Sequence, residues 1–594
     1  MAVHERLALR EEVIESFRHA YDSYMTYAWP LDELMPLSCK GRRWDRRQRG
    51  TLDDALGGYH LTLVDSLDML ALVGDGDAFR SAVKKVLRHV SFDRDVTVSV
   101  FEANIRVLGG LLSAHQIATE LGPGGRLGPP GWYNGGLLNL AHDLGKRLLP
   151  AFDTPHGIPV HLVNLRRGVV RGAGGGTAAA AVAEQTCSAA AGTFMVEFGV
   201  LSQLTGDLRF EAAARRAVRA LWAMRSPLGL VGNALHVGEA KWTQGHAGIG
   251  AGTDSFYEYL LKAYVLLGDE EFGGMFAEAY AAAQEHTRWR SWHIEVDMFL
   301  GGAAPHSYHV SALQAFWPAM QVLAGDVEAA RAGHRALHGL WGKFRALPEV
   351  YNAKTKSLLS FGRDSPLRPE LAESTYALFQ STGDPHYLDV GQELLFALQN
   401  VSRVPCGYAS VADVTTGELD DRMDSYVISE TFKYLFLLFD SSLPPEDQVS
   451  LFCPPSPLAG PAKKGGRRGA EEAGPPAAAA GGRGPEVNTG KNSSASPFRW
   501  RWGRGWGRRR GRDGATGRRR RRRRRRHRRA RPRGGPRVPT TVSPASGHGA
   551  LHGGACVPHH PPGAGKGAAR GRRSRRRRWR SWGGGRAGGP GRGG

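Results

Sequence analysis

A short phrase, in which an apolar stretch runs into Gly-Asp, recurs along this sequence. It ends at Asp75, Asp207, Asp269, Asp326 and Asp384, so the last four copies are 62, 57 and 58 residues apart and the first gap, 132 residues, is roughly two such units. Each copy follows apolar residues at helical spacing, as in SFYEYLLKAYVLLGD, and most precede another helical segment, as in LRFEAAARRAVRALWAM. A glycine that ends one helix, followed by an aspartate that begins a turn or caps the next helix, is typical of helical hairpins.

A unit of about 60 residues holds two helices of ordinary length and two loops, and about seven such units fit into residues 1–452. Repeated helical hairpins form either an open solenoid or a closed ring of paired helices. Because solenoid repeats usually run to about 30–47 residues, the longer unit favours the closed ring, an all-α fold of the α/α barrel type. Strand signals are weak and local, as in RDVTVSVF (94–101) and HIEVDMF (293–299), and they predict short hairpins on one rim.

The positive charge of the chain is concentrated in its last part. The whole sequence has a net charge of +23, yet residues 453–594 hold 38 Lys and Arg against 4 Asp and Glu, which leaves residues 1–452 mildly acidic. A Pro/Gly/Ala-rich opening and the arginine run at 518–526 cannot bury enough apolar surface to offset chain entropy, so we predict a disordered basic tail. It could bind nucleic acid or an anionic surface. The alternatives are a charged tail with no specific role and an artefact of the gene prediction.

Cysteine usage and the termini constrain the class of protein further. Five cysteines are too few for a disulfide scaffold, and those of the body, Cys39, Cys187 and Cys406, lack zinc-binding spacing. On composition alone, one long-range disulfide and free thiols both remain open. The sequence contains no run of about 18 apolar residues, so it predicts no transmembrane helix. The first residues, MAVHERLALREEV, lack the apolar core of a signal sequence.

Several apolar stretches carry charged residues that a core excludes unless they are paired. They are Glu102 and Arg106, one helical turn apart in FEANIR; Asp254 after the glycine-rich GIGAG; Glu349 in ALPEVYN; Arg368, Glu370 and Glu373 in LRPELAES; and Asp424 and Glu430 in DRMDSYVISE. Any one of them is more often a helix cap or a structural ion pair. Together, at the heads of apolar helices, they suggest carboxylates converging on the mouth of a barrel.

The surroundings of two of these residues predict different protonation. Pro369 suits a first helical position and places Glu370 in a first turn beside Arg368, where the helix dipole and the guanidinium both favour a carboxylate, and hence a base. Glu102 lies among Phe, Val, Ile and Leu. Loss of hydration there favours the protonated acid while Arg106 opposes it, so Glu102 fits a proton donor if the first effect is larger. Two carboxyl groups of divergent proton affinity are what glycoside hydrolysis requires.

Residues 12–452 resemble glycoside hydrolase family 47, and within it the ER degradation-enhancing α-mannosidase-like proteins. The phrases that carry the resemblance are HAYDSYMTYAWPLDELMPLSC, LTLVDSLDML, VFEANIRVLGGLLSAH, GAGTDSFYEYLLKAYVLLGD, PLRPELAESTY and RMDSYVISETFKYLFLLFD. It implies an (α/α)7 barrel over residues 1–452. It also implies Ca²⁺-dependent, inverting hydrolysis of α-1,2-linked mannose on the high-mannose N-glycans of misfolded glycoproteins.

The same resemblance assigns roles to individual residues. Matching phrase to phrase, it implies catalytic roles for Glu102 (proton donor), Asp254 (acid/base), Glu349 and Glu370 (base), and substrate-binding roles for Arg106, Arg368, Glu373 and Asp424. It further implies a Cys39–Cys406 disulfide, N-glycosylation of Asn400 in NVS, and location in the lumen of the endoplasmic reticulum with an oxidoreductase as a partner.

Two departures from the family accompany this resemblance. Family members continue, just after the position of Phe452, into a Thr-Glu-x-His segment whose threonine binds calcium directly, whereas this chain turns into CPPSPLAG. The direct metal ligand is therefore unknown. The missing signal sequence leads us to expect a truncated N-terminus.

Three functions remain in view. The leading one is an α-1,2-mannosidase that trims N-glycans of misfolded glycoproteins for ER-associated degradation. The alternative is a mannose-binding quality-control lectin that keeps the barrel without turnover. The third is a polyanion binder that acts through the arginine-rich tail. Since this function ranks last, nucleic acid is the least expected partner.

Overall fold

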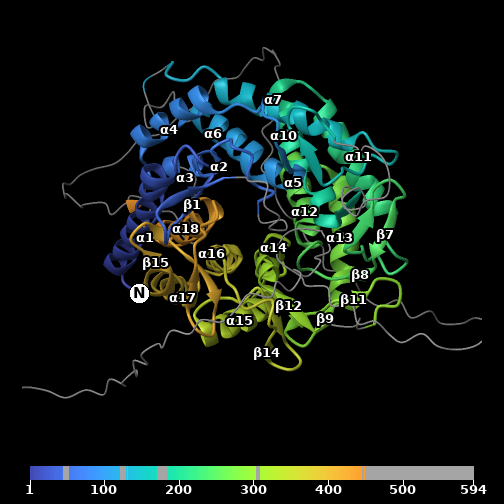
Figure 1. The fold of residues 1–594 in the computed structure, drawn as a ribbon. Coiled ribbons are helices and arrows are strands. Elements are labelled where there is room, and N and C mark those ends of the chain that lie inside the picture. Colours follow the sequence, from blue (N-terminus) through green and yellow to red (C-terminus); the bar gives the residue numbers. More distant parts are fainter. Residues whose placement is uncertain are drawn as a thin grey trace, which may run out of the picture. The chain divides into compact units, whose positions relative to one another are not determined.

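In the computed structural model, helices pair along the chain and the pairs close into a ring (Figure 1). The inner helices are α3 (Leu67–Leu72), α6 (Gly109–Glu120), α10 (Met195–Thr205), α12 (Asp254–Leu267), α14 (Trp317–Leu323), α16 (Glu370–Thr382) and α18 (Phe432–Ser441). The outer helices are α1 (Val3–Ser23), α4 (Gly76–His89), α7 (Gly136–Leu148), α11 (Arg209–Ala223), α13 (Glu270–His286), α15 (Val327–Phe344) and α17 (His386–Ala397). The last inner helix, α18, packs against α1 and closes the ring. The predicted (α/α)7 barrel is thereby confirmed.

The structure describes residues 1–43, 53–120, 127, 129, 131–169, 184–302, 308–444 and 447–448. These residues belong to one compact unit. The predicted basic tail, residues 453–594, lies outside them. Within the described part of the chain, no helix combines the length and the apolar character that crossing a membrane requires.

The recurring Gly-Asp phrase marks the turns between helices, as expected. Its five glycines, Gly74, Gly206, Gly268, Gly325 and Gly383, all have φ between +65° and +85°, a left-handed conformation that favours glycine. Three of them follow the last residue of α10, α12 and α16. The aspartates of three phrases cap the next helix, because their side chains accept backbone N–H bonds at the starts of α4, α13 and α15. The Gly-Asp phrases therefore predict correctly where these helices end and begin, because glycine and aspartate act on the adjacent turns.

Apolar stripes hold the outer helices against the inner ring. In α4 the buried side chains are Phe79, Ala82, Val83 and Val86, which is the spacing of a single helical face. The basic residues of α4 point away from that face. The same arrangement along the chain places the main hydrophobic core between the two rings of helices.

The inner helix α12 has a polar stripe that faces the central cavity as well as an apolar face in the core. In α12, Phe256, Tyr257 and Leu260 are buried in the core, whereas Asp254, Glu258 and Lys262 line the central cavity. Residues four apart share one side of a helix. The centre of the ring is consequently polar although it is surrounded by a hydrophobic core.

Short elements connect the helices. Among the described residues they are the helices α2 (Leu61–Asp65), α5 (Val100–Glu102) and α9 (Ser188–Gly192); the π-helices η1 (Tyr24–Ala28), η2 (Ala103–Leu108), η5 (Leu398–Ser402) and η6 (Val427–Thr431); and the 3-10 helices η3 (Leu149–Phe152) and η4 (Ala312–Phe316). A π-helix has a wider turn than an α-helix and often occurs at functional sites. Two of these π-helices, η2 and η6, carry residues of the cavity described below.

The strands are short and antiparallel, in sheets of two or three. They are β1 (Glu33–Met35), β2 (Lys40–Arg42), β3 (Thr97–Ser99), β4 (Leu162–Asn164), β5 (Gln185–Cys187), β6 (Ala234–His236), β7 (Lys241–Gln244), β8 (His246–Ala247), β9 (Arg288–Trp289), β10 (Trp292–His293), β11 (Val296–Asp297), β12 (His309–Ser311), β13 (Val350–Asn352), β14 (Ser357–Leu358), β15 (Arg403–Val404), β16 (Gly407–Tyr408), β17 (Ser410–Asp413) and β18 (Glu418–Asp420). The strands expected at 94–101 and 293–299 are present as β3, β10 and β11, but of these only β10 forms a hairpin, with β9; β3 pairs with the distant β4 and β11 with the distant β8. Many precede inner helices, and thereby fix where those helices begin.

Candidate active site

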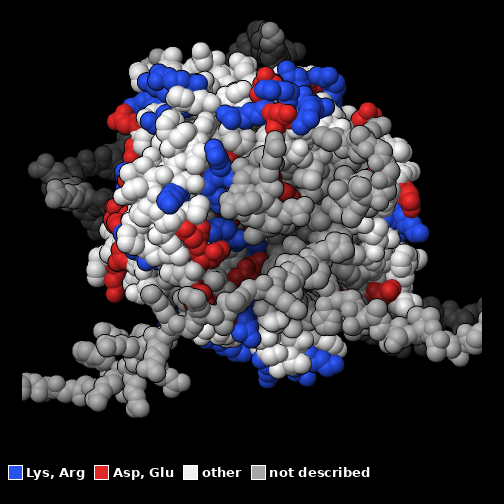
Figure 2. All heavy atoms as spheres, viewed as in Figure 1, with Lys and Arg blue, Asp and Glu red and all other residues white. Residues whose placement is uncertain are grey.

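A cavity of about 380 Å³ lies at the centre of the ring. Its carboxylates are Asp65, Asp68, Glu102, Asp254, Glu258, Glu370, Glu373 and Glu430, and its cationic side chains are Arg106, Lys262, Arg368 and Lys433. Figure 2 shows acidic side chains at the central hollow of this face. Carboxylates outnumber cations in this cavity, so the pKa values of its acids are expected to be shifted.

The loops before two inner helices place their carboxylates. Asp254 is the first residue of α12, and its N–H donates to the Gly250 carbonyl at 3.0 Å. Gly252 in the same loop has φ +89°, and a Cβ there would come within 2.6 Å of Asn233 Oδ1. The glycine-rich loop is therefore required for close packing at the start of α12. In the same way Pro369 immediately precedes Glu370, the first residue of α16.

Glu102 and Arg106 form an ion pair and also line the cavity. Arg106 Nε donates to Glu102 Oε2 at 2.7 Å. The guanidinium lies over the ring of Tyr426, 5.1 Å from its centroid, and Nη1 is 3.7 Å from Glu430 Oε1. Because Arg106 touches these three groups, it holds the Glu102 carboxylate in one orientation at the cavity wall.

Asp254 is a buried acid with a strongly shifted proton affinity. Burial raises its pKa to about 7, and the nearby Glu258 carboxylate adds to the rise. The backbone N–H of Ser255, which donates to Asp254 Oδ1 at 2.9 Å, and the Arg368 guanidinium both oppose the rise. Glu258 is itself paired with Lys262, at 2.5 Å between Oε1 and Nζ.

Glu370 differs from its sequence-based expectation. Burial raises its pKa to about 8, although Arg368 opposes the rise and repulsion from Glu430 and Glu373 adds to it. Among the described residues its Oε2 atom is buried without a hydrogen-bond partner. The expectation that dipole and guanidinium would keep this group readily ionised is wrong, because burial outweighs both.

Glu349 lies behind Arg368 rather than on the cavity surface. Arg368 Nη2 donates to Glu349 Oε2 at 2.7 Å, and Arg368 Nε donates to Glu349 Oε1. Glu349 is 5% exposed, and of these two described residues only Arg368 lines the cavity. The carboxylate therefore fixes the guanidinium, and the guanidinium faces the space where a ligand would lie.

The structure places Glu373 and Asp424 differently. Glu373 lines the cavity, where burial and the Glu258 carboxylate raise its pKa and the Tyr434 hydroxyl donates to Oε1 at 3.3 Å. Asp424 is not among the described residues that line the cavity. Burial disfavours its carboxylate, but Arg422, whose Nε lies 3.0 Å from Oδ2, and Arg42 hold its pKa below the usual range. The cavity carboxylate of that segment is Glu430.

Further cavity residues were not selected from the sequence. Ser425 Oγ donates to Asp65 Oδ2 at 2.5 Å, and Lys433 Nζ lies 2.6 Å from Asp68 Oδ2. The sequence does carry a signal for Asp65 and Asp68, because LTLVDSLDML places these two aspartates three residues apart inside an apolar helical run. In α12 the sequence similarly places Lys262 one turn after Glu258.

The described residues do not form a direct calcium site. Carboxylate oxygens are the ligands that Ca²⁺ prefers, yet the described residues contain no group of three or more His, Cys, Asp or Glu side chains placed to hold a metal ion. The segment that follows Phe452, where the family carries its calcium-binding threonine, lies outside the described residues. The described part of the chain therefore does not identify a direct ligand for the ion.

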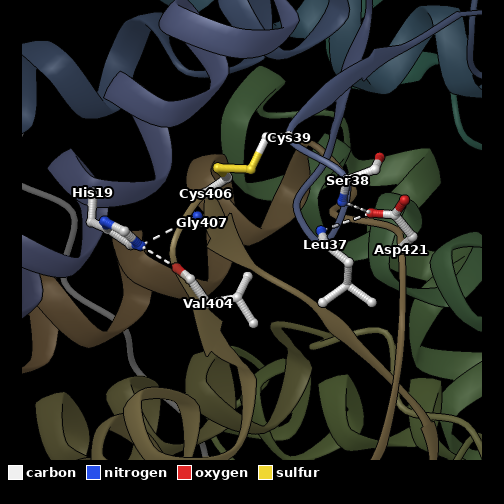
Figure 3. The surroundings of a disulfide bond; sticks show 8 residues. All are labelled: His19, Leu37, Ser38, Cys39, Val404, Cys406, Gly407 and Asp421. Atoms are coloured by element: carbon white, nitrogen blue, oxygen red, sulfur yellow. Dashed lines mark hydrogen bonds between the residues drawn. A yellow bond between two sulfur atoms is a disulfide. The ribbon is translucent and has the colours of Figure 1, made fainter.

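The implied disulfide is present. Cys39 and Cys406 are bonded, with their Cα atoms 5.6 Å apart across a sequence separation of 367 residues (Figure 3). Gly407 N–H donates to His19 Nε2 at 3.2 Å, and Asp421 Oδ1 accepts the N–H of Leu37 and of Ser38. These contacts tie the β1–β2 and β15–β16 hairpins to their neighbours on both sides of the bond.

The proposed glycosylation site is accessible. Asn400 is exposed in η5. Its side-chain amide donates to the Phe396 carbonyl at 2.7 Å.

An α/α barrel around a carboxylate-lined cavity suits glycoside hydrolysis, and comparison with known proteins identifies the family. The profile of glycosyl hydrolase family 47 matches residues 16–450, and the chain belongs to this family. Alpha-mannosidase I MNS4 of Arabidopsis thaliana is 47% identical over 445 residues, which are 75% of this chain and 67% of that protein. ER degradation-enhancing alpha-mannosidase-like protein 3 of Homo sapiens is 45% identical over 441 residues, 74% of this chain and 46% of that protein.

A solved structure supports the fold independently. The alpha-1,2-mannosidase from Trichoderma reesei superposes with a TM-score of 0.63 at 24% identity, covering 75% of this chain and 96% of that one. The family and the α-mannosidase relatives support a glycosidase activity related to ER-associated degradation.

Proposed function

We propose that this chain is an inverting α-1,2-mannosidase that trims the high-mannose N-glycans of misfolded glycoproteins in the lumen of the endoplasmic reticulum. The observation that carries the proposal is the central cavity, which brings Glu102, Asp254 and Glu370 together from three segments of the chain. Membership of the family and the similarity to ER degradation-enhancing relatives support the substrate class.

Glu102 is the proposed proton donor. In inverting hydrolysis an acid protonates the leaving glycosidic oxygen as the bond from that oxygen to the anomeric carbon breaks. Arg106, 2.7 Å from the carboxylate, orients Glu102 toward the sugar. As the proton leaves, the guanidinium stabilises the carboxylate that forms.

Glu370 is the proposed base. It takes a proton from a water molecule while the water oxygen bonds to the anomeric carbon from the opposite face, so that the configuration inverts. Burial raises its pKa to about 8, so the deprotonated carboxylate has a high affinity for the proton of the water. Its deprotonated form is favoured by Arg368, which Glu349 holds in place. Asp254, at the start of α12, shares the acid/base role.

The remaining charged groups are proposed to bind the sugar. Arg368 and Glu373 offer a donor and an acceptor for mannose hydroxyls. Asp424 acts at one remove, because it accepts the Tyr426 hydroxyl at 2.9 Å and Tyr426 lines the cavity.

Calcium is the proposed cofactor. Mannosidases of this family are generally calcium-dependent, and a bound divalent cation supplies charge stabilisation and coordination of sugar oxygens. Removal of calcium with a chelator is therefore expected to abolish mannose release.

The other proposals concern the whole chain. We propose residues 1–452 as the barrel domain and residues 453–594 as a separate basic tail. The Cys39–Cys406 disulfide suits an oxidising lumen, where a thiol–disulfide oxidoreductase would be a partner. Asn400 is proposed to carry a glycan.

Release of mannose tests this proposal directly. The full chain is incubated with a high-mannose N-glycan, with calcium and separately with a chelator, beside the variant Glu102→Gln. Release that requires both calcium and Glu102 is expected. Binding of the glycan without release by the wild-type chain would contradict the enzyme and favour a mannose-binding lectin on the same barrel.

A further inference from the structure

Glu197 is a buried carboxylate that contacts two walls of the cavity from behind. It lies in the first turn of α10 and is 7% exposed. Its Oε2 atom accepts a hydrogen bond from Asn104 Nδ2 at 2.8 Å, and its Oε1 atom accepts one from the Tyr259 hydroxyl at 2.7 Å. The two oxygens therefore bond to two different elements, η2 and α12.

The first bond reaches the turn that carries the proposed acid. Asn104 is fully buried and lies between Glu102 and Arg106 in the chain. Its amide also donates to the Thr193 carbonyl at 3.0 Å. Because η2 is a π-helix, its backbone is wider than that of the flanking helices. Side-chain bonds to Asn104 thus hold a turn whose own backbone pattern is irregular.

The second bond reaches α12, a different segment of the cavity lining. Tyr259 lines the cavity in α12, directly after Glu258 and five residues after Asp254. Burial keeps the pKa of its hydroxyl well above the usual range, so the group remains a donor. Burial also raises the pKa of Glu197 to about 7, while the bonds from Tyr259 and Asn104 oppose that rise.

Glu197 itself is separated from the cavity. The described cavity lining includes Gly109 and Tyr259 but not Glu197. A Cβ on Gly109 would lie 3.8 Å from Glu197 Cγ, so the carboxylate sits immediately behind this glycine. It can therefore act on a bound sugar only through the residues that it holds.

We propose that Glu197 is a positioning residue that sets the spacing between the two sides of the cavity. Through Asn104 it holds η2, which directly follows Glu102, and through Tyr259 it holds α12, which begins at Asp254. For its kinetic readout this inference rests on the proposed mannosidase activity. Misplacement of a reacting group by about 1 Å can lower a rate on the order of 100-fold, so loss of either bond should reduce turnover more than sugar binding.

The variants Glu197→Gln and Asn104→Asp, alone and together, test the first bond. Glu197→Gln keeps the size of the side chain but leaves a single acceptor oxygen, so Asn104 and the Tyr259 hydroxyl can no longer each donate to an oxygen of their own. The double variant restores a bond with reversed polarity, because the new carboxylate at position 104 can accept from the new amide at position 197. We expect kcat to fall on the order of 10- to 100-fold in each single variant, with KM within a few-fold, and the double variant to exceed both in kcat.

Glu295→Gln is the matched control. Burial raises the pKa of Glu295 to about 7 as well, and this described residue does not line the cavity. We expect Glu295→Gln to keep the wild-type kcat and the wild-type pH–rate profile, whereas Glu197→Gln shifts the limbs of that profile because Glu102 and Asp254 move. Equal losses in the two variants would overturn the proposal and indicate a general loss of core stability.

Backbone hydrogen exchange gives a readout that is independent of turnover. We expect Glu197→Gln to accelerate exchange in both 103–109 and 254–262, and Tyr259→Phe, which removes one bond, to do so only in 254–262. Unchanged exchange in both segments would overturn the proposal even if the wild-type chain proved inactive, an outcome that would separately contradict the mannosidase. If Glu197→Gln fails to fold, Tyr259→Phe and Asn104→Asp decide between the outcomes by the same two measurements.

Discussion

Arg368 interacts with a buried carboxylate behind the cavity and with two acids that line it. It donates two hydrogen bonds to the buried Glu349, and its charge opposes the raised pKa of both Asp254 and Glu370. A planar guanidinium can do this because its nitrogens form a fork that matches a carboxylate. Arg368 is therefore the residue through which a buried ion pair acts on the acid/base groups of the cavity.

Arg368→Lys should separate the charge of this residue from its geometry. Lysine keeps the charge on one nitrogen and leaves Glu349 with one bond fewer, at a cost of about 1.5–3 kcal/mol for a hydrogen bond to a charged group. We expect kcat/KM for mannose release to fall about tenfold or more. Arg363→Lys, at a half-exposed ion pair with Asp413, is the control and should change little. Equal activity of the two variants would contradict this role.

Individual residues also show where sequence reasoning ends. The Glu102–Arg106 pair was predictable because its partners lie one helical turn apart. The protonation of Glu370 was not, because its neighbours Glu430 and Glu373 and the depth of its burial depend on the closed ring. For the same reason the sequence could not show that Glu430 lines the cavity and that Asp424 pairs with Arg422 and Arg42 instead.

At the scale of helices and strands, much of the fold depends on local chemistry. Asp75 caps α4 by accepting the Ala78 N–H at 2.9 Å. The preceding glycine adopts the left-handed conformation that ends the previous turn. Interactions over three or four residues can be recognised in a sequence, so the helix boundaries could be predicted. The π-helical turn η2 could not, since its Asn104 is held by residues on another helix.

Asp75→Ala tests the capping interpretation. Loss of a helix cap costs about 1 kcal/mol of stability on average, whereas Asp75→Asn keeps an acceptor oxygen and should cost less. The free energy of unfolding from urea titration of both variants measures the difference. If both variants lower the free energy of unfolding by similar amounts, the effect comes from the ion pair of Asp75 with Arg18, at 2.9 Å, and not from the cap.

At the scale of the whole barrel, the Cys39–Cys406 bond acts where the chain closes on itself. It joins hairpins that are 367 residues apart in sequence, and α1 packs there against α18. Removing a native disulfide commonly costs about 2–5 kcal/mol. We expect Cys39→Ser, Cys406→Ser and the double variant to lower Tm by equal amounts. A double variant less stable than either single variant would contradict a direct pairing.

The cavity should also make stability depend on pH. Burial raises the pKa of Asp254 to about 7 and of Glu370 to about 8, against about 4 in an unfolded chain. Between those values the folded state binds more protons than the unfolded state, so stability decreases as pH rises from about 4 to about 8.

We therefore expect Tm in the presence of a chelator to fall between about pH 5.5 and about pH 8.5. Glu370→Gln cannot ionise at this position and should flatten the dependence. A wild-type Tm that rises over this range would contradict the assigned shifts.

We propose that the carboxylate cavity hydrolyses an α-mannoside with inversion. Proton NMR of the first mannose released by the full chain from a high-mannose N-glycan tests this reaction most directly. We expect β-mannose to appear first and later to equilibrate with the α-anomer, and Glu102→Gln to lower the rate on the order of 100-fold or more. First release of α-mannose, or a rate unaffected by Glu102→Gln, would contradict inverting hydrolysis by this cavity.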